Sequence, residues 1–305
     1  MNAIELVDVW KSFGETTAVA GLDLLVPRGC IFGLLGPNGA GKTTTIRMVM
    51  DIIAPDHGAI RVLGQPNSGE VLDRVGYLPE ERGLYPKMKV VELLELFGVL
   101  KGLPRQEARS RAGEWLSRFG LQDWAENKVE QLSRGMQQKV MFIGTVLHQP
   151  DVIILDEPFS GLDPISSTEV KEVILGEKRR GATIVFSTHL MEQVEKLCDE
   201  ICLINEGKAV LRGPVAEVKK RFGARNVLLA YDGQPDFLYD TSLVAHYDDY
   251  GHYVEIRPAE GVSPQVLLQR AVREVEVRRF EVKEPSLHDI FIQVVKGEAR
   301  REVPA

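Results

Sequence analysis

Residues 36–43 have the types and the spacing of a loop that holds phosphate groups. Their sequence, GPNGAGKT, fits the P-loop pattern G-x-x-x-x-G-K-[ST]. Glycines let the backbone curl so that successive N–H groups point at phosphate oxygens. The pattern predicts that Lys42 reaches the β- and γ-phosphates of a nucleoside triphosphate and that the Thr43 hydroxyl binds Mg²⁺. The expected phosphate-binding residues are Gly36, Pro37, Asn38, Gly39, Ala40, Gly41, Lys42, Thr43 and Thr44.

The context of this loop makes a chance match improbable. By composition alone such a match arises on the order of once in 100 chains. Here residues 30–35 form an apolar run of strand length before the loop, and apolar residues recur at helical spacing after it, at 46, 49, 50 and 53. A strand, a glycine-rich loop and a helix are the arrangement in which the loop binds phosphate, because the helix aims its positive end at the anion.

Two adjacent carboxylates follow a second apolar run, in the sequence VIILDE at residues 152–157. A buried strand that ends in an acid would present Asp156 to the Mg²⁺ held by Thr43. Glu157 would then orient and polarise the attacking water as a general base. A solvated strand end is the ordinary alternative for such a pair, and the phosphate loop favours the catalytic interpretation.

The sequence LSRGMQQ at residues 132–138 resembles the LSGGQ signature of ABC ATPases. It precedes the strand that ends in Asp156 at a distance typical of that family, and the resemblance extends over roughly residues 3–220. The resemblance implies that the nucleotide is ATP. It also implies that Ser133 and Gly135 contact the γ-phosphate of an ATP bound by a second subunit. The ordinary role of such a serine is to cap a helix, and here that helix end would point at the anion.

Three further positions match other functional residues of the family. Phe13 occupies the place of the aromatic residue that stacks on adenine, although core packing is its ordinary alternative. Asp163 closes the sequence SGLD at 160–163, which resembles the family's D-loop. His189, after the apolar run at 184–186, resembles the switch histidine that senses the γ-phosphate.

Two positions depart from the family pattern. Glu80 stands where the Q-loop normally has a glutamine near the Mg²⁺; a carboxylate can bind the metal but has no N–H to donate. Arg134 stands where the signature normally has a glycine, and Gly135 is retained. These variants resemble the ATPases of bacterial ABC-2-type exporters, which include sodium, drug and peptide efflux systems. The sequence PSLHDIF at 285–291 resembles the C-terminal domain of the same subgroup.

The resemblance implies a mechanism and partners. The chain has one P-loop and one signature, so a second copy or a homologue must complete each ATP site, and two ATP molecules close the dimer. Membrane permease subunits would dock in a groove between the core and the helical subdomain, lined by residues 80–91. The protein would then be cytoplasmic, on the inner face of the cell membrane through its permease. The alternatives are a soluble ABC ATPase, for example in iron–sulfur assembly or translation, and a regulatory ATP binder; Glu157 and His189 argue against the regulatory binder.

The elements that must position these residues alternate along the chain. Strands are expected at 2–10, 22–26, 30–35, 152–155, 183–186 and 201–204. Helices are expected at 90–100, from Pro104 as first helical residue to 119, and at 134–148, 168–180 and 190–197. The alternation predicts an α/β fold in which helices cover both faces of a parallel sheet. The expected architecture is a P-loop core with N-terminal antiparallel strands and a helical subdomain inserted at about 85–148.

The character of the sequence changes near residue 222, which divides the chain into an ATP-binding domain at 1–222 and a small α+β domain at 223–305. In the second domain, strands are expected at 226–231, 243–246, 251–257 and 274–282, and helices at 264–273 and 286–296. No catalytic motif falls in this region, and the charged residues 297–305 are expected to fray.

The composition fits a globular protein and limits its partners. Of the 305 residues, 44% are hydrophobic and 27% charged, and the net charge of −7 argues against a nucleic-acid binder. The three cysteines, Cys30, Cys198 and Cys202, give no disulfide framework, which suits a reducing cytosol. The N-terminus lacks the features of a signal peptide, and no apolar run has the ~18 residues that cross a bilayer. We therefore expect any work at a membrane to be done through a partner.

Overall fold

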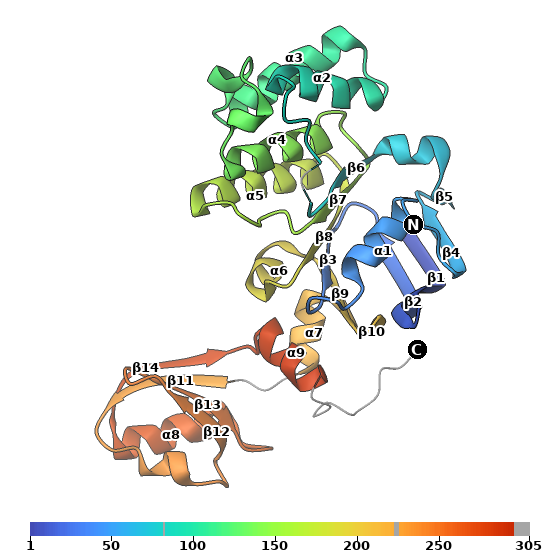
Figure 1. The fold of residues 1–305 in the computed structure, drawn as a ribbon. Coiled ribbons are helices and arrows are strands. Elements are labelled where there is room, and N and C mark those ends of the chain that lie inside the picture. Colours follow the sequence, from blue (N-terminus) through green and yellow to red (C-terminus); the bar gives the residue numbers. More distant parts are fainter. Residues whose placement is uncertain (82, 223–225, 296–305) are drawn as a thin grey trace. The chain divides into compact units, whose positions relative to one another are not determined.

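The computed structural model describes residues 1–81, 83–222 and 226–295 (Figure 1). The chain divides by contacts into two compact units, one of Met1–Pro214 and one that begins at Val215. The boundary expected from composition, at 222–223, lies one helix later, so the two criteria divide the chain at opposite ends of α7 (Val215–Arg221). Each of the two units is compact.

A six-stranded sheet lies at the centre of the first unit (Figure 1), in the order β10-β9-β3-β8-β7-β6. Neighbouring strands are parallel, except that β10 is antiparallel to β9. Every residue of β3, β7 and β8 is buried, as expected for strands with both faces covered. The predicted parallel-sheet core is therefore confirmed. The strands are β3 (Ile31–Leu35), β6 (Val75–Leu78), β7 (Val152–Asp156), β8 (Thr183–Thr188), β9 (Glu200–Asn205) and β10 (Lys208–Pro214).

A four-stranded antiparallel sheet, in the order β2-β1-β4-β5, shares a core with the central sheet. Helix α1 (Lys42–Val49) contributes Ile46, Met48 and Val49 to that core. The helix ends before Ile53, where the sequence predicted it to continue, because Asp51 takes a left-handed backbone with φ 56°. Ile53 still packs against the core from the loop. The strands are β1 (Asn2–Phe13), β2 (Thr16–Pro27), β4 (His57–Val62) and β5 (Gln65–Pro66).

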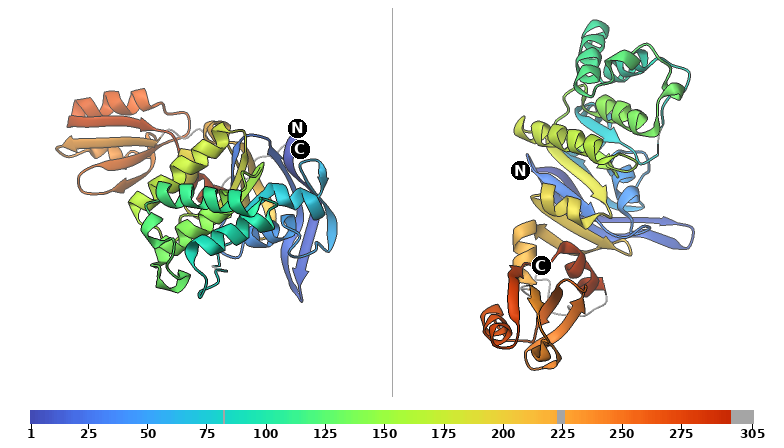
Figure 2. Two further views of the ribbon diagram at one scale, coloured as in Figure 1. Left: turned by 90° about the horizontal axis from the view of Figure 1, so that it is seen from above. Right: turned by 90° about the vertical axis from the view of Figure 1, so that its left-hand side faces the viewer.

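Helices α2 (Val90–Leu100), α3 (Arg105–Arg118) and α4 (Arg134–Val146) form the inserted helical subdomain, in teal and green in Figure 2. The sequence predicted Pro104 as the first helical residue of α3, but Pro104 is the N-cap and the helix begins at Arg105. Helices α5 (Pro164–Arg179) and α6 (Met191–Leu197) pack on the central sheet. Helix α5 begins four residues earlier than predicted, because Asp163 caps it.

The second unit is a four-stranded antiparallel sheet with the order β12-β13-β11-β14. Helix α8 (Pro264–Glu274) packs on the face that carries Val227, Leu229 and Ile256. The strands are β11 (Asn226–Asp232), β12 (Val244–Asp249), β13 (Val254–Pro258) and β14 (Glu276–Lys283), and α9 (Leu287–Val295) follows them. Residue 296, predicted to end that helix, lies outside the described residues. Short 3-10 turns occur at Gly69–Arg74, Gln122–Trp124, Val129–Gln131 and Asp236–Tyr239.

Two further features of the described residues concern membrane crossing and the cysteines. No helix in the described part of the chain combines the length and the apolar character that a membrane crossing requires. All three cysteines are unpaired thiols, and burial raises the pKa of Cys30 and of Cys202 to about 12. These thiols are therefore protonated packing groups and not nucleophiles at neutral pH.

Candidate nucleotide-binding site

A polar hollow of about 320 Å³ opens between the start of α1 and the carboxyl ends of β6 and β7. The carboxyl edge of a parallel sheet is where α/β proteins bind their ligands. Residues from four separate parts of the sequence converge here, and all but one of them were predicted from sequence; Ala18 was not. The hollow is lined by Ala18, Asn38, Gly39, Gly41, Lys42, Thr43, Thr44, Glu80, Asp156 and Glu157.

The loop between β3 and α1 needs its glycines for two physical reasons. Gly39 and Gly41 have positive φ of 79° and 105°, a region that other residues avoid. In addition, a Cβ on Gly36 would lie 2.2 Å from the Ile204 carbonyl oxygen, and one on Gly41 would lie 2.4 Å from that of Ala18. Pro37 and Ala40 shape the same loop through a hydrogen bond from the Ala40 N–H to the Pro37 carbonyl, at 3.2 Å.

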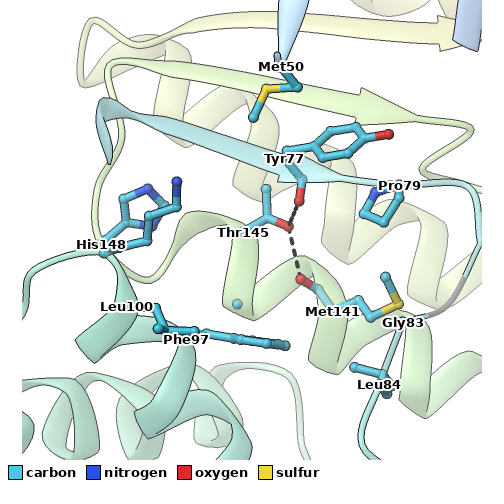
Figure 3. Close-up of a pocket in the computed structure, with 12 residues that line it drawn as sticks. Met50, Tyr77, Pro79, Gly83, Leu84, Phe97, Leu100, Met141, Thr145 and His148 are labelled. Carbon is cyan, nitrogen blue, oxygen red and sulfur yellow. Dashed lines mark hydrogen bonds between the residues drawn. The ribbon is translucent and has the colours of Figure 1, made fainter. Parts of the chain in front are cut away.

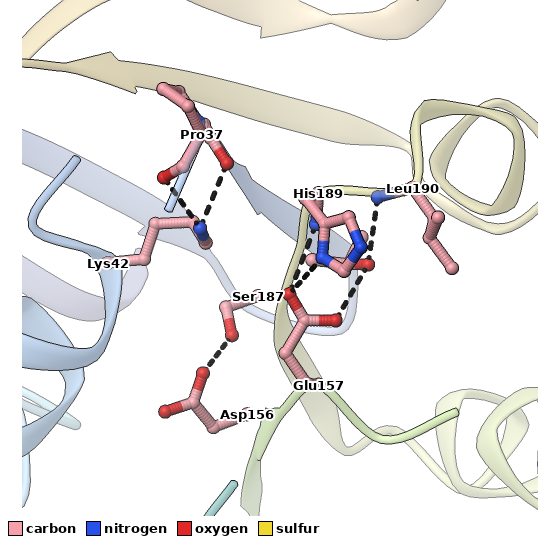
Figure 4. Close-up of polar contacts among 9 residues, drawn as sticks. Pro37, Lys42, Asp156, Glu157, Ser187, His189 and Leu190 are labelled. Atoms are coloured by element: carbon pink, nitrogen blue, oxygen red, sulfur yellow. Dashed lines mark hydrogen bonds and ion pairs between the residues drawn. The ribbon is translucent and has the colours of Figure 1, made fainter. Parts of the chain in front are cut away.

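Lys42 is held inside this loop. Its ammonium donates to the carbonyl oxygens of Gly36 and Pro37, at 2.9 and 3.1 Å (Figure 4), and the residue is 7% exposed. Burial lowers the pKa of Lys42, while the neighbouring charges of Glu157, Asp156 and Glu80 act in the opposite direction. A cation beside three carboxylates, whose hydrogen bonds go to carbonyl oxygens of the phosphate loop, is placed to accept an anionic phosphate in exchange.

Asp156 ends β7 and is 1% exposed. The Ser187 hydroxyl donates to its Oδ1, whereas its Oδ2 is buried and has no hydrogen-bond partner within the described residues (Figure 4). An unpaired buried carboxylate oxygen is costly, so Oδ2 is suited to a cation or to its bound water. The described residues form no group of three His, Cys, Asp or Glu that could hold a metal ion by themselves. The site therefore fits Mg²⁺ only in the way that Mg²⁺ is usually held, by one or two carboxylates together with phosphate oxygens and water.

Glu157 follows β7 with a left-handed backbone, φ 49°, that is uncommon for a residue with a side chain. Its carboxylate accepts hydrogen bonds from the Thr188 hydroxyl and the His189 N–H, both at 3.2 Å. The His189 Nδ1 lies 2.8 Å from the same carboxylate (Figure 4). His189 does not line the hollow, but this contact joins it to the residue predicted as the base. The sequence analysis did not predict that Ser187 and Thr188 contact these two carboxylates. The signal in the sequence was two hydroxyl residues at the end of an apolar strand.

Gly36, Pro37 and Ala40 belong to the loop but do not line the hollow, and four predicted residues from other elements also lie outside it. Phe13 is 53% exposed at the end of β1, with the Lys11 Nζ 5.6 Å from its ring centre. Ser133 is exposed and caps α4 by accepting from the Met136 N–H at 3.3 Å. Gly135 follows in the first turn of α4. Asp163 caps α5, and hydrogen bonds from Ser166 lower the pKa of its carboxyl group.

A second hollow, of about 320 Å³, is mainly apolar (Figure 3). It lies between β6 and helices α2 and α4, and the predicted docking segment contributes Gly83 and Leu84 to it. Burial and the Lys101 charge lower the pKa of His148 to about 4, so this imidazole is neutral at physiological pH. The hollow is lined by Met50, Tyr77, Pro79, Gly83, Leu84, Phe97, Leu100, Lys101, Met141, Gly144, Thr145 and His148.

Comparisons with known proteins agree on one family. Residues 19–160 match the family described as ABC transporter, and residues 213–295 match the family described as ATP-binding protein DrrA1-3-like, C-terminal domain. The ABC transporter ATP-binding protein YhaQ of Bacillus subtilis (strain 168) is 44% identical over 94% of this chain and 96% of that protein. Nod factor export ATP-binding protein I of Paraburkholderia xenovorans (strain LB400) is 39% identical over 97% and 98%. A solved structure described as an ATP binding subunit of an ABC transporter superposes with a TM-score of 0.68 at 31% identity, over 72% of this chain and 93% of that one.

Proposed function

This chain belongs to the ATP-binding proteins of ABC transporters, and from this premise we propose how its polar hollow, the ATP hollow, acts as one half of an ATP site. The protein is an ATPase that drives transport. The observation that carries the proposal is the convergence of Lys42, Asp156 and Glu157 on one hollow, with His189 in contact with Glu157.

In the proposed site, the loop N–H groups and Lys42 bind the β- and γ-phosphates. Thr43 and Asp156 would hold Mg²⁺, and Glu80, which lines the same hollow, would add a third oxygen ligand. When bound, the metal neutralises charge on the phosphate oxygens. Glu157 orients the attacking water and takes its proton, and the hydrogen bonds from Thr188 and His189 hold this carboxylate on the side of the hollow.

The rest of the ATP site would come from a second copy of the chain or from a homologue. Ser133, Gly135 and Asp163 lie outside the hollow, and those with side chains are exposed, as residues that meet a partner's nucleotide must be. The N-terminus of α4, where Ser133 is the cap, would face the γ-phosphate across the interface. Phe13 would stack on adenine, since its ring is exposed and not part of the core.

The partner that couples hydrolysis to transport would be a membrane permease. The apolar hollow has the lining of a docking site for an apolar segment, and it adjoins β6, whose end leads to Glu80 in the ATP hollow. The protein would thereby sit on the cytoplasmic face of the membrane. Export is the favoured direction, because relatives with matching length include a protein named for Nod factor export.

The test compares the wild-type protein with Glu157→Gln and Lys42→Ala. Glu157→Gln should bind Mg-ATP as the wild type does but hydrolyse it about 10²–10⁴ times more slowly, because the general base is lost. Lys42→Ala should lose tight ATP binding, which a fluorescent ATP analogue would measure by titration. Hydrolysis by Glu157→Gln at the wild-type rate would refute the assignment of the base.

A further inference from the structure

We propose that Ser187 is a positioning residue that fixes the carboxylate of Asp156 so that its free oxygen faces the metal of Mg-ATP. This inference rests on the metal role proposed above for Asp156. It goes further because Ser187 neither lines the ATP hollow nor was expected to take part in the site.

The geometry begins with strand register. Asp156 and Ser187 are paired directly across the parallel strands β7 and β8. Residues paired in this way project their side chains from the same face of the sheet. The Ser187 hydroxyl consequently donates to the Asp156 Oδ1, and Ser187 is 0% exposed. Within the described residues, the Ser187 side chain makes no other hydrogen bond.

The two carboxylate oxygens of Asp156 differ in their hydrogen bonds. A carboxylate can rotate about its last side-chain bond, which exchanges Oδ1 and Oδ2. The hydrogen bond from Ser187 occupies one oxygen and leaves the other, which is buried and unpaired, as the acceptor available to a cation. Without the hydroxyl, both oxygens would be buried without a protein partner, and the orientation of the carboxylate would no longer be fixed. Hydrogen bonds of this kind to metal-binding carboxylates typically contribute 10–100-fold to metal affinity.

Neighbouring residues at the end of β8 contact different carboxylates. Thr188 and His189 hold Glu157, whereas Ser187 holds Asp156. Three consecutive residues of one segment therefore position two carboxylates with different roles. This division predicts that changes at Ser187 affect the metal requirement, while changes at His189 affect the hydrolytic step.

The experiment measures how much Mg²⁺ is needed for binding of a fluorescent ATP analogue, together with direct Mn²⁺ binding by electron paramagnetic resonance. Ser187→Ala should raise the half-saturating Mg²⁺ concentration by about 10–100-fold and should weaken Mn²⁺ binding in parallel. Binding of the analogue in EDTA should not change, because the phosphate loop is intact. Ser187→Thr keeps the hydroxyl and should restore the wild-type value.

The matched control is Thr183→Ala, which removes another buried hydroxyl from the same strand. Thr183 is 2% exposed and accepts from the Gly29 N–H at 2.9 Å, at the end of β8 opposite the ATP hollow. Its loss should leave the Mg²⁺ requirement unchanged. Thermal unfolding in EDTA checks that each variant is folded. If Ser187→Ala does not fold, Ser187→Cys replaces it, because a thiol is a weaker donor of similar size. Ser187→Cys should then raise the Mg²⁺ requirement.

Asp156→Asn separates failure of this inference from failure of the proposed site. If Asp156→Asn raises the Mg²⁺ requirement and folded Ser187→Ala (or Ser187→Cys in its place) does not, the positioning role is wrong and the metal role of Asp156 stands. If neither variant changes it, the metal role of Asp156 is wrong as well. An equal rise in Thr183→Ala would also overturn the proposal, because the effect would then follow from any loss of a buried hydroxyl.

Discussion

At the scale of single residues, His189 and Glu157 are in direct contact. The imidazole Nδ1 and the backbone N–H of His189 both bind the Glu157 carboxylate, which is mostly buried, while the imidazole itself is half exposed. A histidine in this place can hold the carboxylate with one nitrogen and present the other to a phosphate oxygen. The base and the residue proposed to sense phosphate are therefore one connected unit.

This contact predicts the behaviour of His189→Ala. The variant should bind ATP normally, because His189 does not line the ATP hollow. Its hydrolysis should fall by about 10²–10⁴, since Glu157 loses a hydrogen-bond donor and the phosphate loses a contact. Steady-state turnover together with ATP-analogue binding measures both quantities. His57→Ala is the control, because His57 is exposed and pairs with Asp8 on the surface. Turnover near the wild-type rate in His189→Ala would show that this residue has no role in hydrolysis.

The residues of the site differ in how far sequence can predict them. The phosphate loop is predictable because a contiguous pattern of glycines and a lysine encodes both its shape and its chemistry. Ser187 is not, because its role depends on a register between β7 and β8, two strands that are 27 residues apart or more in the sequence. The contribution of Ala18 to the hollow likewise follows from how β2 packs beside the loop, which no local pattern encodes.

At the scale of elements, long periodic segments were predictable and short ones were not. Helix α2 has the predicted limits because eleven residues show one continuous apolar face that ends at the expected place. Strands β4, β6 and β10 were not predicted. The four residues of β6 are too few to show a period, and β4 and β10 are largely exposed strands without a continuous apolar run. These strands form only because the neighbouring strands pair with them.

The helical subdomain contains an ion pair between two helices that the apolar pattern of α2 does not predict. Glu95 lies on the otherwise apolar face of α2, and its carboxylate is 7% exposed. Burial alone would raise its pKa, but hydrogen bonds and charges from Arg105 and Arg109 of α3 outweigh this effect and lower the pKa below 4.5. Helices α2 and α3 are thus joined by an ion pair with one buried member.

Glu95→Gln should therefore lower the melting temperature of the protein, by about 2–4 °C for each kcal/mol lost. Because the folded-state pKa is depressed, the stabilisation is fully present above the ordinary pKa of 4.5 and is lost as the pH falls through the folded-state pKa. The difference in melting temperature between wild type and variant should accordingly shrink below pH 4.5. Glu107→Gln is the control, since it breaks a pair with Arg111 on α3 whose carboxylate is 43% exposed and not buried. A loss as large in Glu107→Gln would contradict the special role of the buried carboxylate.

At the scale of the whole molecule, every residue that lines the ATP hollow or the apolar hollow lies in the first unit. The second unit matches a family of C-terminal domains of ATP-binding proteins, and relatives aligned over more than 90% of this chain share both units. The sequence predicted its sheet strands from two patterns: β13 alternates apolar and polar residues, whereas β11 contains a continuous apolar run at 227–230. The proposed ATP chemistry is thus contained in one unit, and the signature residues Ser133 and Gly135 are not among the residues that line the ATP hollow.

Because the ATP hollow of one chain lacks the signature residues, we expect ATP to bring two chains together. Gly135 stands at the start of α4, and a Cβ there would have only the Gly161 carbonyl oxygen nearby, at 3.8 Å. Gly135→Glu should therefore fold and keep its own ATP hollow, but its carboxylate would repel the phosphates of ATP held by the partner. In a Glu157→Gln background, which hydrolyses slowly, ATP should shift the protein from monomer to dimer, and adding Gly135→Glu should abolish this shift. Analytical ultracentrifugation with Mg-ATP measures the two species.

The control is Gly113→Glu, in the same Glu157→Gln background. Gly113 is an exposed glycine of α3, and among the described residues no atom outside its own stretch of helix lies within 4 Å of where a Cβ would be, so the same charge is added on a different helix from the signature. This variant should dimerise with ATP as its parent does. ATP-dependent dimers of the Gly135→Glu variant would mean that α4 does not face the partner's nucleotide. Monomers of both Glu157→Gln and its Gly113→Glu control would instead mean that two copies close only on their permease, or that the chain closes only with a homologous subunit, in which case the two halves of each ATP site come from different proteins.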